Sequence, residues 1–391
     1  MADGATAERA AGRVGSKALI REINEALVLD VVRRRGTTSR AEITSSTGLS
    51  PATVTGITGQ LVGEGLLLES DVLRGTGGRP ARLLQLGRDA VVVAGVQLSP
   101  DAVEIALVDL RGDVVSTLQV PLSSTTPDTA ADTVAAAVSS VIASHPGSEL
   151  RGVSVALSGV VDRPRGIVRH SGALGWEDVP FAALLAGRLG RRVAIDSLVN
   201  SFTTGLLLLD TDLAERDVIV FSVGASLGAS MLTRGRIHRG FRGGAGGFAH
   251  SAIGRRDGGA LCHCGAHGCL ETQSSVWGLR QALETRGIDP SDLVAPAASA
   301  VLGDGGAKLG LAIANASKMF GPERVVLVLA AEIGQTVFEE ACREAFTAEY
   351  AFGDAVPPFL VTVPADGDIF ARGAGYDMIT ELFSAEPVGG L

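Results

Sequence analysis

Residues 262–271 read Cys-His-Cys-Gly-Ala-His-Gly-Cys-Leu-Glu, and His250 precedes them with eleven residues between. The chain has four cysteines, and three of them fall inside this run. Three thiolates and one imidazole complete a tetrahedral zinc shell and leave no position for a catalytic water. Glycines within the run allow the tight turns that bring the thiols to one ion. The pattern predicts a structural zinc ion held by His250, Cys262, Cys264 and Cys269.

The composition is that of a folded protein without a membrane segment. The chain has 391 residues, of which 46% are hydrophobic and 20% charged, enough for two or three domains. No apolar run approaches the roughly 18 residues that a membrane helix needs. Residues 1–16 lack the apolar core of a signal peptide and are expected to form a disordered tail. Few cysteines, clustered as ligands, favour a cytoplasmic location, and Cys342 is expected in the core.

The formal charge of −9 is divided unevenly along the chain. Residues 1–88 carry 12 Lys and Arg against 9 Asp and Glu, a net of +3. The remainder has 34 − 12 = 22 basic residues against 43 − 9 = 34 acidic ones, a net of −12. A mildly basic segment on an acidic body is typical of a small anion-binding module joined to a larger domain.

The segment after the tail has the pattern of three short helices. Apolar residues from Ile20 to Val32 recur at helical spacing, and the helix ends near Gly36. Ser39 and Glu42 form a capping box that opens a second helix, which a turn at Gly48 closes. Ser50, followed by proline, opens the third. A short helix, a glycine turn and a capped helix predict a helix-turn-helix, whose second helix enters the major groove of DNA.

Two apolar stretches, 66–69 and 81–86, enclose the basic loop 74–80 and predict a β-hairpin wing. Arginine in such a loop suits phosphates or a narrow minor groove. Few long donors are available elsewhere, so a large share of the contacts should go to the DNA backbone. A three-helix bundle used for protein contacts is the alternative. The residues expected to face double-stranded operator DNA are Arg40, Ser50, Ala52, Thr53, Thr55 and Arg79.

Residues 89–391 carry two similar series of strands and helices. Strands are expected at 91–96, 103–110 and 114–120, then a helix at 129–144 and a buried strand at 153–157. A second series begins at 218–223 and continues through a hairpin at 229–237, helices near 273–286 and 306–320, and a strand at 325–329. This duplication predicts a two-lobed α/β domain with a ligand-binding cleft.

The whole chain resembles the ROK family (repressors, open reading frames, kinases). Residues 17–88, including Gly77-Gly78-Arg79-Pro80, resemble its winged helix-turn-helix repressors, and residues 89–391 resemble its sugar-kinase domain. The run of His250 and Cys-x-Cys-Gly-x-x-Gly-Cys-x-Glu is its most specific motif. The resemblance implies an actin-like (ribonuclease H-like) fold, the same four zinc ligands, a homodimer or homotetramer, and transcriptional control of carbohydrate metabolism.

The chain departs from the family pattern at the positions that serve catalysis. Leu198 stands where the family has the aspartate that accepts the sugar proton, and leucine cannot accept one. Nearby Asp196 is expected to be a solvated residue at a strand end. The other departures lie in the phosphate loops, the adenosine side and the sugar site: Gln97, Gly224–Gly228, Ala330, Ala331, Ala173 and Gly247.

Three residues of the sugar site remain, namely Asn200, His250 and Glu271. Glu271 either meets a ligand or bonds His250 or the zinc loop in support of the metal. His263 and His267 are expected to be exposed, because four ligands are already supplied. Residues 240–247 are expected to form a flexible cleft loop.

The sequence therefore predicts a transcriptional regulator, a repressor, with no catalytic residues. Its degenerate kinase domain would serve oligomerisation and the sensing of a sugar or another metabolite. The alternative is an ATP-dependent sugar kinase with an added DNA-binding domain. A constitutive regulator that binds no effector is a third reading.

Overall fold

The computed structural model describes residues 17–73, 81–88, 90–209, 211–253, 258–351, 357–365 and 367–383. The predicted tail 1–16 and the tip of the predicted wing, with Arg79, lie outside these residues. The chain divides into two compact units, one of Met1–Val91 with Thr380–Leu391 and one of Val92–Ile379. We call residues 17–88 the head and residues 92–379 the body.

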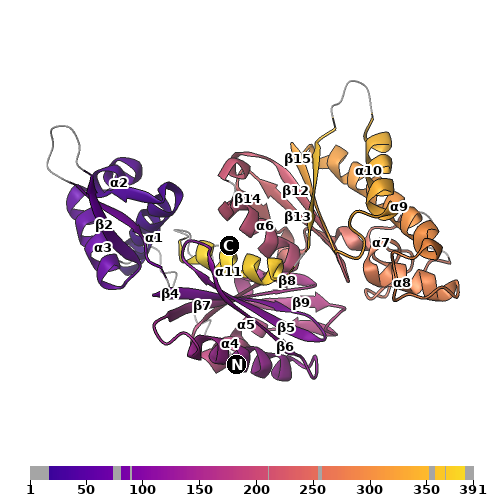
Figure 1. Cartoon of the computed structure of the whole chain (residues 1–391), viewed down its shortest axis with the longest axis horizontal. Helices are drawn as coiled ribbons and strands as arrows, with labels where there is room; N and C mark the ends of the chain where they lie inside the picture. Colours follow the sequence, from indigo (N-terminus) through magenta and orange to yellow (C-terminus); the bar gives the residue numbers. More distant parts are fainter. Residues whose placement is uncertain are drawn as a thin grey trace, which may run out of the picture. The chain divides into compact units, whose positions relative to one another are not determined.

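The head consists of helices and a small antiparallel sheet (Figure 1). Its elements are α1 (Lys17–Arg35), β1 (Thr37–Ser39), α2 (Arg40–Thr47), α3 (Pro51–Gly63), β2 (Leu67–Leu73) and β3 (Ala81–Leu86). The strand order is β1-β3-β2, so the predicted hairpin of β2 and β3 is confirmed and gains a third strand between α1 and α2. Val28, Val32, Ile43, Val54 and Leu61 form the buried faces of the three helices.

The body begins with a lobe built on one mixed sheet. Its elements are β4 (Val91–Leu98), β5 (Ala102–Asp109), β6 (Val114–Pro121), α4 (Pro127–Ala143), β7 (Glu149–Leu157), β8 (Val160–Asp162), η1 (Arg163–Arg165), β9 (Ile167–Ser171), β10 (Trp176–Val179), α5 (Phe181–Leu189) and β11 (Arg192–Ser197). The main sheet has the order β11-β7-β4-β5-β6, and β8, β9 and β10 form a separate small sheet. We call this the first lobe.

Helix α6 (Leu198–Leu209) and η2 (Thr211–Glu215) lead to the second lobe. Its elements are β12 (Val218–Val223), β13 (Leu227–Thr233), β14 (Arg236–His238), η3 (Phe241–Gly243), η4 (Gly247–His250), α7 (Glu271–Ser274), α8 (Val276–Thr285), η5 (Pro296–Ala298), α9 (Ser299–Phe320), β15 (Arg324–Leu329), α10 (Val337–Tyr350) and β16 (Phe359–Pro364). Helix α11 (Ile369–Leu382) ends the described chain.

The two main sheets share one plan. The second has the order β14-β13-β12-β15-β16, in which β12, β13 and β14 pair antiparallel while β15 and β16 pair in parallel. In the first, β4, β5 and β6 pair antiparallel and β11 pairs in parallel with β7. The α/β class and the duplication are thus as predicted.

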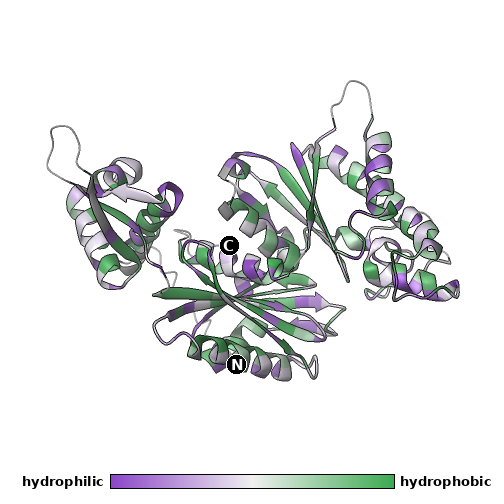
Figure 2. Cartoon of the chain, in the orientation of Figure 1, coloured by the Kyte–Doolittle hydropathy of each residue, from purple (hydrophilic) through white to green (hydrophobic). Residues whose placement is uncertain are grey.

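The central strands of each main sheet are buried on both faces, and Figure 2 shows their apolar character. In the first lobe, Val92, Ala94 and Val96 pack with α4 and α5 in one core. In the second, alternate residues of β12 face α8, α9 and α10 on one side and α6 on the other. Such strands read as continuous apolar runs, because neither face meets water.

Helix α11 returns from the second lobe to the sheet of the first (Figure 1). A side chain at Gly95 would lie 1.9 Å from the carbonyl of Ala371, and one at Gly373 would meet the backbone of α6. Glycine at these positions lets α11 lie directly on β4 and α6. Helices α6 and α11 therefore connect the two lobes.

Several elements were not predicted from the sequence: β1, β8, β9, β10, α5 and α6. Helix α9 begins at Ser299 rather than near residue 306. Cys342 is fully buried in α10, as predicted for a small core residue. Among the described residues, every helix is too short or too polar to cross a lipid bilayer.

Candidate metal centre and nucleic-acid interface

Helices α2 and α3 of the head have the predicted caps. Ser39 and Glu42 form the full capping box, in which Glu42 accepts the backbone N–H of Ser39 at 2.7 Å. Gly48 closes α2 in the left-handed conformation, with φ of +71°. Ser50 caps α3 by accepting the N–H of Thr53 at 3.1 Å. These local bonds fix the angle at which α3 leaves the turn.

The exposed face of α3 carries small residues. Ala52 and Thr55 are exposed, whereas Thr53 is half-buried and its hydroxyl lies 2.8 Å from that of Ser50. Gly56 and Gly59, which were not among the residues predicted to face DNA, are exposed on the same helix, with no atom within 4 Å of the position of a side chain. Because its side chains are small, the exposed face of α3 can lie close to the wall of a DNA groove. The two glycines within the apolar pattern of this helix indicate such a face in the sequence.

Arg40, one of the residues predicted to face DNA, is held by the head itself. Its guanidinium donates to Thr58 Oγ1 at 2.9 Å and to Glu69 Oε1 at 2.7 Å. Arg82 pairs with the same carboxylate. Hydrogen bonds from the two arginines lower the pKa of Glu69. Arg40 therefore ties α2 to α3 and β2, and a phosphate would have to compete with Glu69 for it.

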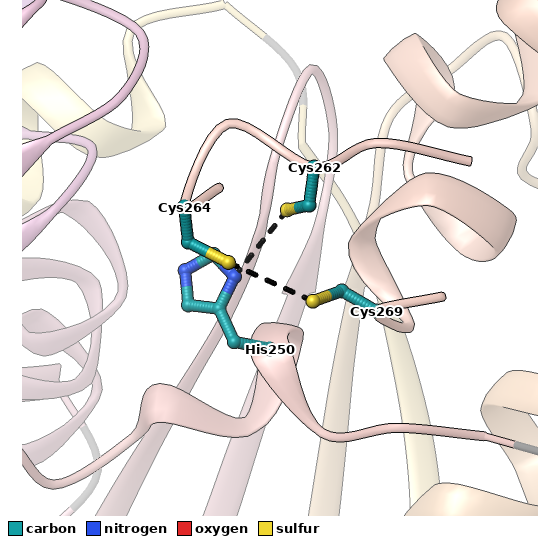
Figure 3. A group of neighbouring side chains, drawn as sticks. All are labelled: His250, Cys262, Cys264 and Cys269. Atoms are coloured by element: carbon teal, nitrogen blue, oxygen red, sulfur yellow. Dashed lines mark hydrogen bonds between the residues drawn. The ribbon is translucent and has the colours of Figure 1, made fainter. Parts of the chain in front are cut away.

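The four predicted metal ligands lie together in the second lobe (Figure 3). His250 ends η4, and the cysteines stand on the turn before α7. This turn needs Gly265 and Gly268, whose φ angles are +82° and +69°. The N–H of Cys262 donates to Ala266 at 2.8 Å and closes the loop on itself.

The ligand atoms have the spacing of a tetrahedral shell. All four lie within 4.8 Å of one another. Cys264 Sγ lies 3.7 Å from Cys269 Sγ, and Cys262 Sγ lies 3.6 Å from His250 Nδ1. Sulfur atoms at about 2.3 Å from one zinc ion would stand roughly 3.8 Å apart. The geometry and the donor set therefore fit a metal ion with four protein ligands.

The burial of these groups also suits a metal ion. Burial raises the pKa of the Cys262 thiol to about 12, so that this sulfur becomes a thiolate only beside a cation. Burial lowers the pKa of His250, with smaller contributions from His170 and His263, and thereby favours the neutral imidazole that binds metals. His263 and His267 are exposed, as predicted, and the ring of His263 lies 3.9 Å from that of Trp277.

Glu271 connects the metal loop to another loop of the cleft. Its carboxylate accepts the N–H of Leu227 at 2.9 Å, rather than the predicted bond from His250 or the zinc loop. Burial raises its pKa to about 7. Leu227 belongs to the segment Gly224–Gly228, so Glu271 stabilises the turn that resembles a phosphate loop.

The prediction that Asp196 is solvated is wrong. Asp196 is fully buried at the end of β11 and accepts from two arginines, Arg163 at 3.4 Å and Arg239 at 2.7 Å. Its other oxygen accepts the amide of Asn200 at 2.8 Å. Arg163 also pairs with Asp377 of α11. Sequence reasoning missed this cluster, because its arginines are distant in sequence from Asp196. We call these residues the charge cluster: Arg163, Asp196, Asn200, Arg239 and Asp377.

Two positions that differ from the kinase pattern, Leu198 and Gln97, lie at the start of α6 and near the end of β4. Leu198 is half-buried beside the charge cluster at the start of α6. The Oε1 atom of Gln97 is buried and, among the described residues, has no hydrogen-bond partner. Glu104 of β5 lies opposite Gln97, and burial, with the carboxylates of Asp101 and Asp368, raises its pKa.

The segment 240–247, predicted to be a flexible cleft loop, contains η3 and leads into η4. Gly243 and Gly246 lie against the backbone of Val161 and Ala229.

The ROK family model matches residues 93–357, more than half of the chain. A putative xylose repressor of Caldicellulosiruptor sp. (strain Rt8B.4) is 26% identical over 367 residues, covering 86% of this chain and 92% of the relative. The DNA-binding transcriptional dual regulator NagC of Escherichia coli (strain K12) is 28% identical over 335 residues, covering 81% and 82%.

Two solved structures show the shared fold. A ROK family transcriptional regulator, a homologue of the E. coli MLC protein, matches with a TM-score of 0.77 and 22% identity, over 93% of this chain and 97% of that one. A ROK family glucokinase from Streptomyces griseus, in complex with glucose and AMPPNP, matches with a TM-score of 0.65 and 21% identity, over 74% of this chain and 99% of that one.

Proposed function

Because this chain belongs to the ROK family, we propose that it is a DNA-binding transcriptional repressor whose kinase-like body has no catalytic activity. Relatives that span most of the chain are named as repressors of xylose or N-acetylglucosamine systems. The observation that carries the proposal is the head, in which two capped helices meet at a left-handed glycine.

In this proposal the head, residues 17–88, is a winged helix-turn-helix, followed by the two-lobed body. The amino end of α3 enters the major groove, where Ala52 and Thr55 reach base edges and Ser50 and Thr53 face phosphates. Arg79 serves the wing in a minor groove. In a dimer the half-sites would lie about 34–36 Å apart or at a multiple of that distance.

The body would bind and transmit rather than catalyse. Phosphoryl transfer needs a proton acceptor beside the sugar, and Leu198 cannot be one. Oligomerisation as a homodimer or homotetramer, and sensing of a sugar or another metabolite near Asn200, His250 and Glu271, are the functions that we assign to it.

We assign zinc to the four-ligand site. Three thiols and one imidazole are the donors that zinc prefers, and four protein ligands leave no place for a reactive water. The ion, when bound, supplies structure: it would hold η4 to the loop before α7, and so place Glu271 and the segment Gly224–Gly228.

DNA binding is tested by incubating the purified protein with fragmented chromosomal DNA and sequencing the retained fragments. The proposal expects a small set of fragments that share a pseudo-palindrome. A double variant, Ala52→Glu with Thr55→Glu, should lose them, because two carboxylates on α3 would face phosphates. Retention of the same fragments by this variant would contradict the assignment of α3.

The alternative, an ATP-dependent sugar kinase, is tested by ADP release over a panel of hexoses. We expect no turnover above background, with an active hexokinase as the positive control. Sustained, sugar-dependent ADP release would overturn the non-catalytic assignment and leave that of the head standing.

A further inference from the structure

One segment of the second lobe reaches across to the first. Residues 239–246, which we call the strap, follow β14 and precede η4. The N–H of Ala245 donates to the carbonyl of Arg239 at 3.0 Å, so the strap closes on itself at its base. Arg242 within it has a φ of +53°, a conformation that side chains other than glycine rarely adopt. Such backbone strain persists only where surrounding contacts impose it.

The first contact of the strap with the first lobe is an ion pair. Arg239 donates to Asp196 Oδ2 through Nη2 at 2.7 Å and through Nε at 2.9 Å. Asp196 belongs to β11 of the first lobe, while Arg239 extends from the sheet of the second. The carboxylate is fully buried and the arginine is 27% exposed, so water screens this pair weakly.

The second contact depends on a glycine. A side chain at Gly243 would lie 1.9 Å from the carbonyl oxygen of Val161 in β8. Glycine is thus required for the strap to lie directly on the backbone of the first lobe. A further bond between the lobes, from Ser158 to Ser226 at 2.8 Å, lies outside the strap.

From these contacts we propose that the strap is a latch between the lobes of the body, which Arg239 and Gly243 hold closed. A molecule that competes for Asp196 has to displace the guanidinium of Arg239 and offer hydrogen-bond donors in its place. Such a displacement frees the strap and lets the lobes separate. The latch concerns the body alone and does not depend on DNA binding.

The chain offers a matched control for the ion pair. Arg169 donates to buried Asp162 at 2.6 Å and is 21% exposed, and Asp162 keeps Arg165 as a second partner. This pair lies entirely within the first lobe. Arg239→Ala likewise leaves Asp196 with Arg163, so both substitutions remove one of two arginines from a buried carboxylate. Only Arg239→Ala removes a contact between lobes.

Gly243 has a control just outside the strap, at Gly247 in η4. Gly243→Ala places a methyl group against Val161 at a φ of +78°, whereas a side chain at Gly247 would have no atom within 4 Å. Gly247→Ala should therefore leave the strap in place. Arg239→Ala removes a charge and Gly243→Ala changes the shape of the contact. Two independent substitutions therefore test the same latch.

The experiment is hydrogen exchange of the full-length protein, read by mass spectrometry in peptides that cover 239–246, 158–161 and 224–228. Arg239→Ala and Gly243→Ala should each raise exchange about tenfold in all three segments. Arg169→Ala and Gly247→Ala should leave all three at the wild-type rate. Small-angle scattering should show a larger radius of gyration for the two latch variants only.

Unchanged exchange in both latch variants would overturn the proposal. So would faster exchange confined to 239–246, because the lobes would then stay together without the strap. If either latch variant fails to fold by circular dichroism, Arg239→Lys replaces it. That variant keeps the charge but loses one of the two donors, and it should raise exchange in the same three segments.

Discussion

The metal-ligand group and the charge cluster are two polar centres of one body, built in opposite ways. The metal ligands come from residues 250–269 of one lobe, and their atoms converge on a point that only an added cation can fill. The charge cluster draws on both lobes and on α11, and its arginines and carboxylates neutralise one another. The first centre needs a ligand to be complete and the second does not. The difference indicates that one centre can take up a cation, whereas the other joins the two lobes through side chains that the chain itself supplies.

The largest expected effect is the destabilisation of the second lobe when the metal is lost. Cys264→Ala should abolish zinc binding and destabilise the second lobe by on the order of 5 kcal/mol or more, because structural zinc ions bind with about 10–16 kcal/mol. Cys264 is exposed, so its removal leaves no core cavity. Zinc content by mass spectrometry and chemical unfolding measure both effects. Cys342→Ala, a buried thiol outside the group, is the control and should retain one zinc ion per chain. Equal stability with and without zinc would show that the metal-ligand group does not depend on an ion for its stability.

A break in the charge cluster should cost less. Asp377→Asn leaves Arg163 with a weaker partner and should destabilise the body by about 3 kcal/mol, the usual effect of removing one member of a buried pair. Asp377 also accepts from Ser154 at 3.1 Å and Thr204 at 3.3 Å. Urea unfolding followed by circular dichroism gives the value. A change below about 0.5 kcal/mol would mean that the cluster contributes little to folding.

Substitution of Arg40 distinguishes a structural role of this residue from a contact with DNA. Arg40→Ala should destabilise the head by about 1–2 kcal/mol, because it removes a charged hydrogen bond to Glu69. If Arg40 also contacts a phosphate, the salt dependence of DNA binding should fall by about one unit of slope. Titrations at several salt concentrations decide this. An unchanged slope would remove Arg40 from the predicted interface and leave its bond to Glu69 as its role.

The caps of the helices should have smaller effects. Ser39→Ala should destabilise the head by about 1 kcal/mol, since it removes the side chain of the capping box. Thr126→Ala is the control, because Thr126 stands at the same position of α4 without a capping bond. Thermal unfolding compares the two variants. Equal losses would show that the bond at Ser39 does not stabilise α2.

The smallest expected effect is on the stability of the head at acidic pH. Bonds from the backbone and side chain of Ser39, with that of Thr38, lower the pKa of Glu42 below its ordinary value of 4.5. Because the folded pKa is the lower one, this stabilisation is present above pH 4.5 and is lost as the pH falls through the folded pKa. Glu42→Gln should flatten the decline of head stability in that range. A decline as steep as in the wild type would assign the acid sensitivity to other groups.

The features that the sequence predicted best depend on neighbours in the chain. The caps at Ser39 and Ser50 involve residues three positions apart, and the metal ligands stand on one short segment. The alternation of strands and helices likewise predicted two α/β lobes. For the caps and the metal ligands, the pattern and the contact lie within the same twenty or so residues, so the spacing carries the information.

The features that it missed depend on distant residues. Asp196 was expected to be solvated, because nothing near it in the sequence supplies a cation. Its partners Arg163 and Arg239 lie 33 and 43 positions away in the sequence, and Arg239 belongs to the second lobe. The strap was expected to be flexible from its glycines, whereas Gly243 is the residue that lets it pack. Residues that contact each other across the cleft leave no local signal in the sequence.

Retention of chromosomal fragments by the zinc-loaded protein, read by sequencing, tests the central claim most directly. We expect a few fragments that share one pseudo-palindromic site, all lost in the Ala52→Glu, Thr55→Glu variant, while both proteins release no ADP with any hexose. Retention of no fragment by the wild type, together with sugar-dependent release of ADP, would contradict the claim and make this chain a kinase.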